Sequence, residues 1–187
     1  MDEEGYDALV GVLNAKKNII LQGAPGVGKT FIAKRLAYSI MGAKVPERVQ
    51  MVQFHQSYSY EDFIEGYRPC ADGFKLEQGV FHSFCKRAAS DPNNDYFFII
   101  DEINRGNLSR IFGELFMLIE NDKRGSRNKL QLLYSHESFY VPANVYIIGM
   151  MNTADRSLAV LDYALRRRFA FFDLQPGFDA DGFASYR

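Results

Sequence analysis

The sequence predicts an α/β domain with a mainly parallel sheet, and three observations lead to this prediction. Five apolar runs of strand length alternate with segments in which apolar residues recur at helical spacing. The run at 96–100 is unbroken, which is typical of a parallel strand buried on both faces, and the run at 145–151 indicates another buried strand. A glycine-rich turn at 23–30 joins the first apolar run to a helical segment. This alternation favours one sheet covered by helices on both faces.

The predicted elements follow from apolar spacing and from turn and cap residues. In the first half of the chain they are a helix at 6–15, a strand at 18–21, a helix that runs to about Met41 and ends at Gly42, a strand at 48–54, a short helix capped by Ser59, a small hairpin within 66–79 and a helix from Val80. In the second half they are a loop at 91–95, a strand at 96–100, a helix capped by Asn107 that ends near Asn121, a hairpin at 130–141, a strand at 145–151, a helix at 158–168 and a strand at 169–174.

Length and composition are those of a single globular domain. The 187 residues are enough for a sizeable core, and a net charge of −1 gives no general attraction to nucleic acids or membranes. No apolar run approaches membrane-spanning length, and residues 1–4 are not signal-like. Cys70 and Cys85 form no disulfide or metal framework. We therefore expect a cytoplasmic protein without membrane contact.

Residues 23–30 have the spacing G-x-x-x-x-G-K-[ST] between a strand and a helix, the context that identifies a phosphate-binding loop. Glycines let successive backbone N–H groups point into one concavity, and the helix amino end adds partial positive charge. Lys29 is expected to contact the β- and γ-phosphates, and Thr30 to ligate Mg²⁺. A glycine-rich turn without a ligand is the alternative. The loop consists of Gly23, Ala24, Pro25, Gly26, Val27, Gly28, Lys29 and Thr30.

Polar residues also follow two of the other apolar runs. Asp101 is expected to hold Mg²⁺ opposite Thr30, directly or through water. Glu102 is a candidate general base that polarises the attacking water. Asn152 is suited to orient that water or to contact the γ-phosphate. Because ligands of such sheets bind at the carboxyl ends of the strands, we expect these groups to lie together. The alternatives are two acids that simply end a strand and an ordinary turn asparagine.

Three consecutive arginines, Arg166 to Arg168, close the last predicted helix. Cations at a helix carboxyl end favour its dipole, so a structural role is open, although three in a row exceed what capping requires. An arginine supplied by a neighbouring subunit accelerates phosphoryl transfer by ~10³–10⁵. We expect Arg167 and Arg168 to act in trans on a neighbour's nucleotide, since they leave the sheet at a different edge from the phosphate loop.

The remaining polar candidates carry weaker signals. Asn104 suits either a supporting role beside the acidic pair or a turn. His55 lies in an aromatic loop, and His82 and His136 are interpreted as ordinary surface or hairpin residues, without metal-ligand spacing. The basic loop at 123–129 is interpreted as solvated, with contact to a phosphate backbone or an acidic surface as the alternative.

Several of these motifs together resemble a known family. The phosphate loop, the run at 97–105 and the asparagine-ended strand resemble the AAA+ group of P-loop NTPases. More narrowly, Met-Asn-Thr-Ala-Asp-Arg-Ser at 151–157, Leu-Asp-Tyr-Ala-Leu-Arg-Arg-Arg-Phe at 161–169 and the aromatic stretch at 54–66 resemble the McrB type, the GTP-hydrolysing motor subunits of modification-dependent restriction systems. The resemblance extends from about residue 15 to residue 176.

The resemblance implies an αβα sandwich with strand order 5-1-4-3-2, with a nucleotide-binding core at 1–176 and the start of a truncated linker or lid at 177–187. It also implies a hexameric ring, a McrC-like nuclease subunit as partner, and DNA bound through domains outside this chain. The site residues that it implies are Asn152 as sensor 1, Asp155 and Arg156 of the family signature beside it, and Arg167 and Arg168 as arginine-finger candidates.

The nucleotide base and the wider role have alternatives. Residues 128–131 lack the acid of the Asn-Lys-x-Asp element that reads guanine, so GTP rests on the resemblance and ATP is the alternative. A MoxR-like ATPase that remodels protein complexes is one alternative function, and a nucleotide-binding regulatory module without turnover is another. Residues 156–157 and the stretch at 54–66 favour the restriction motor, and the complete catalytic set argues against a module that does not hydrolyse.

Overall fold

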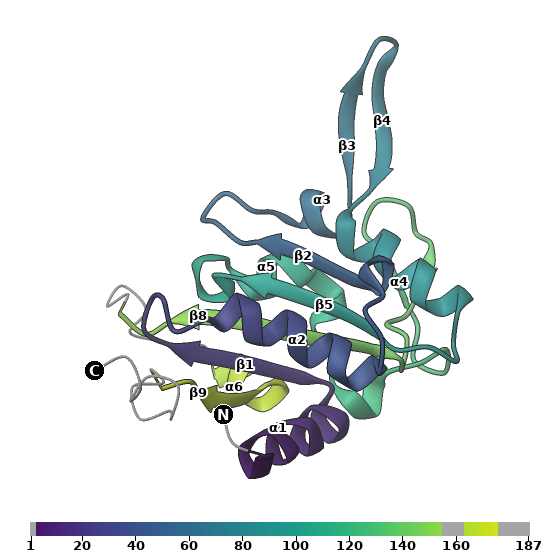
Figure 1. Ribbon diagram of the computed structural model, residues 1–187. Coiled ribbons are helices and arrows are strands. Elements are labelled where there is room, and N and C mark those ends of the chain that lie inside the picture. Colours follow the sequence, from purple (N-terminus) through teal and green to yellow (C-terminus); the bar gives the residue numbers. More distant parts are fainter. Residues whose placement is uncertain (1–2, 155–162, 176–187) are drawn as a thin grey trace.

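The computed structural model describes residues 3–154 and 163–175, and its centre is a five-stranded sheet in which neighbouring strands are parallel (Figure 1). The strand order is β2-β5-β8-β1-β9, which is 5-1-4-3-2 when the sheet strands are numbered along the chain. The predicted fold class and strand order are therefore confirmed. The strands are β1 (Asn18–Gly23), β2 (Val49–Gln53), β5 (Tyr96–Asp101), β8 (Val145–Asn152) and β9 (Ala170–Asp173).

Helices cover both faces of this sheet, because successive side chains of a buried strand point to opposite sides. In β1, Ile19 and Leu21 pack in one core and Ile20 packs in the other. The first core lies under α1 (Glu3–Lys16) and α2 (Lys29–Met41), and the second lies under elements that follow β2. The helices of the second face are α3 (Tyr60–Phe63), α4 (Val80–Ser90), α5 (Leu108–Phe112) and α6 (Tyr163–Arg168).

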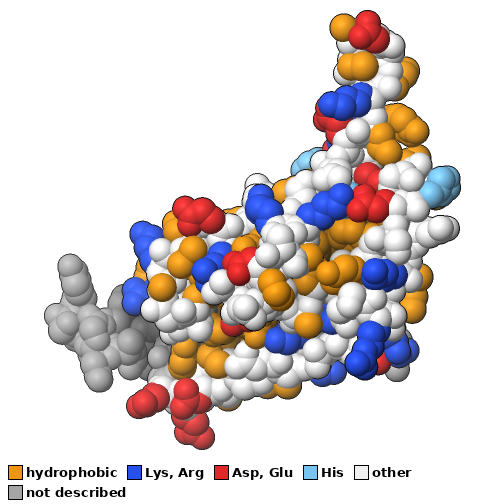
Figure 2. Space-filling model, turned by 90° about the vertical axis from the view of Figure 1, so that its right-hand side faces the viewer, with side chains coloured by type: hydrophobic (Ala, Val, Ile, Leu, Met, Phe, Trp, Pro, Cys, Tyr) orange, Lys and Arg blue, Asp and Glu red, His pale blue; other side chains and the backbone are white. Residues whose placement is uncertain are grey.

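An antiparallel hairpin projects from the body of the domain, as predicted between Gly66 and Gly79 (Figure 1). It consists of β3 (Glu65–Cys70) and β4 (Gly73–Gln78). Figure 2 shows hydrophobic and charged side chains along it, and Phe74 is 73% exposed. Its base is held by the buried carboxylate of Glu65, which accepts N–H bonds from residues 134 and 135.

The predicted continuous helix from Leu108 to about Asn121 was wrong. Asn107 does cap α5, since its Oδ1 accepts a bond from Arg110 N at 3.0 Å, but the α-helix ends at Phe112. Gly113 has φ 52° and ψ −133°, and a Cβ there would lie 2.9 Å from the Tyr60 ring. The close approach of α3 therefore breaks the helix, and 3₁₀ turns continue it as η3 (Gly113–Phe116) and η4 (Asn121–Lys123).

Two predicted surface positions are buried instead. Arg124, in the basic loop interpreted as solvated, is 8% exposed and bonds to backbone carbonyls inside the fold. His82, interpreted as a surface or hairpin residue, lies on α4 and is fully buried against the Phe139 ring. Neither change was visible in sequence, because both side chains are polar and their burial depends on distant segments. His82 packs against Phe139, and Arg124 bonds to Asn18 and Val145. The hairpin predicted at 130–141 is present as β6 (Leu130–Gln131) and β7 (Ser138–Phe139).

Some predictions fall outside the described part of the chain. The signature residues Asp155 and Arg156, the beginning of the helix at 158–168 and the segment at 177–187 belong to this group. Within residues 3–154 and 163–175, no helix combines the length and apolar character that crossing a membrane requires.

Candidate functional site

The phosphate loop, the acidic pair and the asparagine meet at the carboxyl edge of the sheet. Gly23 pairs in register with Asn152, and Asp101 ends the strand on the other side of β8. A backbone bond of 3.2 Å from Thr153 N to Gly23 O ties the two strand ends together. The parallel register therefore brings groups from residues 23, 101 and 152 to one place, as the sequence pattern predicted.

The glycines of the phosphate loop adopt left-handed conformations, which let successive backbone N–H groups point into one concavity. Gly26 and Gly28 have φ values of 85° and 86°, a region that side chains disfavour. Gly28 precedes α2, and no side chain caps this helix, so its first N–H groups stay available. Thr30 is exposed in the first turn. This geometry is that of an anion-binding helix terminus.

Lys29 turns its ammonium back toward the loop. Its Nζ donates to Gly23 O at 2.9 Å and to Ala24 O at 2.8 Å, and the residue is 8% exposed. Burial lowers the pKa of Lys29, while the negative charges of Glu102 and Asp101 act in the opposite direction. The ammonium thus lies between the loop and the acidic pair, with carbonyl partners that a phosphate oxygen can replace.

Glu102 lies in a strained and mostly buried position. Its φ of 52° is in the left-handed region, which is uncommon outside glycine. Its Oε1 accepts a bond from Asn152 Nδ2 at 2.6 Å. Its Oε2 lies 3.3 Å from Arg105 Nε as an ion pair, without the alignment of a hydrogen bond. Asp101 Oδ1 accepts the Glu102 N–H at 3.0 Å, which supports the sharp turn after β5.

The donor set fits a magnesium–triphosphate ligand. Mg²⁺ prefers hard oxygen ligands and is usually held by one or two carboxylates together with phosphates and water. The Thr30 hydroxyl and the Asp101 carboxylate are such ligands. Among the described residues there is no group of three or more His, Cys, Asp or Glu side chains that forms a complete metal cage. A protein cage is not required for this ion, so the residues present match its chemistry.

Comparison with known proteins gives the family. Residues 18–169 match the AAA domain (dynein-related subfamily). The chain belongs to this AAA family. It is accordingly a P-loop NTPase domain, and the predicted resemblance is confirmed at this level.

Three known proteins are similar in sequence to this AAA domain. It is 61% identical to the Type IV methyl-directed restriction enzyme EcoKMcrB subunit of Escherichia coli (strain K12), over 98% of this chain and 41% of the relative. It is 30% identical to the Type II restriction enzyme BsuMI component YdiS of Bacillus subtilis (strain 168), over 83% of this chain and 56% of the relative. It is 29% identical to a proteasome-activating nucleotidase of Methanosarcina mazei, over 89% of this chain and 34% of the relative. The chain thus spans about two fifths to three fifths of the two restriction proteins.

In this AAA domain, Arg167 and Arg168 lie at the opposite edge of the sheet from the phosphate loop. Asn18, the first residue of β1, donates from Nδ2 to Arg168 O at 3.1 Å, whereas Gly23 is the last residue of that strand. Five residue steps of about 3.3 Å separate the two ends by roughly 16 Å. This is longer than an arginine side chain. Arg167 and Arg168 therefore do not reach the phosphate loop of their own subunit.

Sequence reasoning missed two groups that contact the candidate residues. Arg105 pairs with Glu102, and a basic residue three positions after the acid was the available signal. Glu120 contacts both Arg167 and Arg168, which are separated from it by more than forty positions in sequence. No pattern in the sequence points to that contact, because it depends on how the segment after η3 packs beside α6.

Proposed function

We propose that this AAA domain binds and hydrolyses a nucleoside triphosphate with Mg²⁺, as the motor of a McrBC-like, 5-methylcytosine-dependent DNA restriction system. The observation that best supports this proposal is the 2.6 Å hydrogen bond from Asn152 Nδ2 to Glu102 Oε1, beside the phosphate loop. It joins a candidate base to an uncharged amide at the edge where a γ-phosphate would lie. Hydrolysis needs such an orienting group near the attacking water.

In this proposal the loop residues bind the triphosphate. The N–H groups of residues 23–30 surround the phosphates, and Lys29 exchanges its two carbonyl partners for β- and γ-phosphate oxygens. Thr30 and Asp101 hold Mg²⁺, directly or through water. The bound Mg²⁺ neutralises charge that develops on the phosphates.

Glu102 accepts the proton of the attacking water, and Asn152 fixes the position of the Glu102 carboxylate or of the water itself. The left-handed backbone of Glu102 directs its side chain back toward β8 and the amide. Asn152 ends β8, which is in register with β1 and so with the start of the phosphate loop. The distance between the base and the phosphates is therefore fixed by the sheet. The pair Arg167 and Arg168, at the far edge, serves hydrolysis of the nucleotide of a neighbouring subunit.

The wider role rests on similarity to parts of longer proteins. The 61% identity to a methyl-directed restriction subunit supports a restriction motor rather than a MoxR-like remodelling ATPase. We accordingly propose a cytoplasmic homo-oligomer, a hexameric ring, with a McrC-like nuclease subunit as partner. DNA is bound through regions outside this chain. GTP is proposed as substrate from the resemblance of the motifs at 54–66 and 151–169 to the McrB type, with ATP as the alternative.

The test is phosphate release by the full-length protein with Mg²⁺ and the nuclease subunit, using GTP and ATP in parallel. Glu102→Gln should lower kcat by roughly 10²–10⁴-fold while nucleotide binding persists, because only the base is removed. Glu47→Gln, the same change at an exposed residue, is the matched control and should hydrolyse normally. If the wild type releases no more phosphate than Glu102→Gln with either nucleotide, the proposed motor function is refuted.

A further inference from the structure

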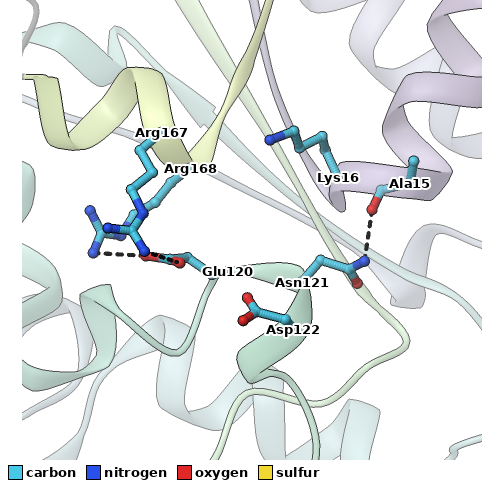
Figure 3. Close-up of a pocket in the computed structure, with 7 residues that line it drawn as sticks. All are labelled: Ala15, Lys16, Glu120, Asn121, Asp122, Arg167 and Arg168. Carbon is cyan, nitrogen blue, oxygen red and sulfur yellow. Dashed lines mark hydrogen bonds and ion pairs between the residues drawn. The ribbon is translucent and has the colours of Figure 1, made fainter.

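Glu120 contacts both arginines that close α6 and lines a recess of about 420 Å³ (Figure 3). Its Oε1 lies 3.0 Å from an Arg168 guanidinium nitrogen, and its Oε2 lies 3.6 Å from one of Arg167. The Glu120 side chain is 14% exposed. One largely buried carboxylate thus uses its two oxygens on two consecutive arginines.

The two arginines are held very differently. Arg168 is 14% exposed, its Nε donates to Phe116 O at 2.8 Å, and its guanidinium lies 4.2 Å from the centre of the Phe116 ring. Its own carbonyl accepts a bond from Asn18. Arg167 is 70% exposed, and its ion pair with Glu120 is longer than a hydrogen bond. Arg168 is therefore anchored on several sides, whereas Arg167 extends into solvent.

This difference decides which arginine can leave its place. Moving Arg168 would strip the Phe116 carbonyl of a charged donor and leave the Glu120 carboxylate partly buried beside a vacated site, which is costly. Moving Arg167 gives up one long, exposed pair, and such pairs contribute little to stability. A phosphate on a neighbouring subunit competes easily with that pair.

We propose that Glu120 is a positioning residue for hydrolysis in trans: it fixes Arg168 as a support and directs Arg167 toward the nucleotide of the neighbouring subunit. The inference rests on the proposed NTPase function. It assigns the phosphate contact to Arg167 and gives Glu120 no contact with the nucleotide. The orientation of Arg167 is then set before the subunits meet, which keeps a reacting group near its productive geometry.

Asp122 provides a matched control in the same recess. It lies two residues from Glu120, its side chain is 70% exposed, and it pairs with Lys123 at 3.1 Å. Replacing it by Asn removes one negative charge near Arg167, as Glu120→Gln does. The two variants therefore separate a general change of charge from the loss of the specific contact.

The experiment measures steady-state hydrolysis by the full-length protein with its partner subunit. Glu120→Gln should lower kcat roughly ten- to a hundredfold, as expected for a misplaced catalytic group, with the KM for nucleotide nearly unchanged. Asp122→Asn should retain wild-type kcat. A KM that rises while kcat is retained, or equal losses in both variants, would overturn the inference.

Mixing subunits tests the direction of the effect and excludes a simple folding defect. Lys29→Ala subunits bind no triphosphate but carry an intact Glu120, Arg167 and Arg168. Added to Glu120→Gln subunits, they should restore activity above the sum of the two separate preparations. Arg167→Ala should be rescued in the same way. Activity no higher than that sum would contradict the inference, whereas an inactive wild type would instead refute the proposed function.

Discussion

The two edges of the central sheet differ in how their polar groups are satisfied. At the carboxyl edge, Glu102 has a left-handed backbone, and the side-chain amide of Asn104 is buried without a hydrogen-bond partner. At the amino edge, Arg124 donates to Ile119 O, Val145 O and Asn18 Oδ1 at 2.6–2.8 Å. Backbone strain and unsatisfied polar groups are frequent at functional sites, as proposed for the carboxyl edge, whereas Arg124 at the amino edge has its donors satisfied.

This difference explains why the amino edge can serve as a fixed support. The amide of Asn18 accepts from Arg124 and donates to Ile119 O and Arg168 O, so one network joins β1 to α6. Burial lowers the pKa of Arg124 to about 10, which still leaves it charged near neutral pH. The carboxyl edge, in contrast, has exchangeable contacts at Lys29. Substitutions at the two edges should therefore affect different properties.

The largest effect is expected for Arg124→Ala. It removes a charged hydrogen-bond donor from three buried acceptors. Each lost bond costs about 1–3 kcal/mol, so the free energy of unfolding should fall by about 3 kcal/mol or more. The corresponding decrease in Tm is roughly 6–12 °C, measured by thermal unfolding. Arg127→Ala, in the same loop but exposed, should change stability by less than about 0.5 kcal/mol. Equal stability of the two variants would show that the amino edge is not the structural one.

Next in size is the effect of Asn152→Ala on hydrolysis. The substitution removes the hydrogen bond from Asn152 to Glu102. Loss of one oriented donor typically lowers kcat by ~10²-fold. Tm should stay close to that of the wild type, because the side chain lies at the open edge. Phosphate release and thermal unfolding are both measured, with Asn93→Ala in an exposed loop as control. A variant that loses stability but retains kcat would reverse the assignment of the edges.

The smallest effect concerns His82, a buried histidine without a hydrogen-bond partner that lies away from both edges. Burial and the Lys86 charge lower the pKa of His82 below its ordinary 6.5, although Glu137 and Glu65 oppose them. The unfolded chain therefore takes up a proton before the folded one does, and stability is lost as the pH falls below about 6.5.

His82→Leu should remove that contribution, so its free energy of unfolding should depend less on pH than that of the wild type between about pH 7.5 and 5.5. Denaturant unfolding at several pH values measures this slope. His55→Gln, at an exposed histidine, should retain the wild-type slope. Hydrolysis at neutral pH should be unaffected, and loss of activity in His82→Leu would mean that this buried histidine also belongs to a functional site.

The fold was largely predictable because its strands carry strong local signals. The run at 96–100 had to be buried on both faces, and it is the strand that places Asp101 and Glu102. The phosphate loop was predictable for the same reason, since its glycines are needed for a particular backbone. The helix after Asn107 was predicted too long, because its break depends on Tyr60, a residue far away in sequence.

The amino-acid sequence by itself determined the strands, the phosphate loop, and the arrival of an acidic pair and an asparagine at strand ends. Periodicity and turn chemistry act between near neighbours, so they can be read from a single chain. The tertiary structure alone decided that Arg124 is buried, that Arg167 and Arg168 lie at the far edge, and that Glu120 contacts both of them. Those outcomes depend on contacts between segments that are distant in sequence, and local sequence patterns do not predict such contacts.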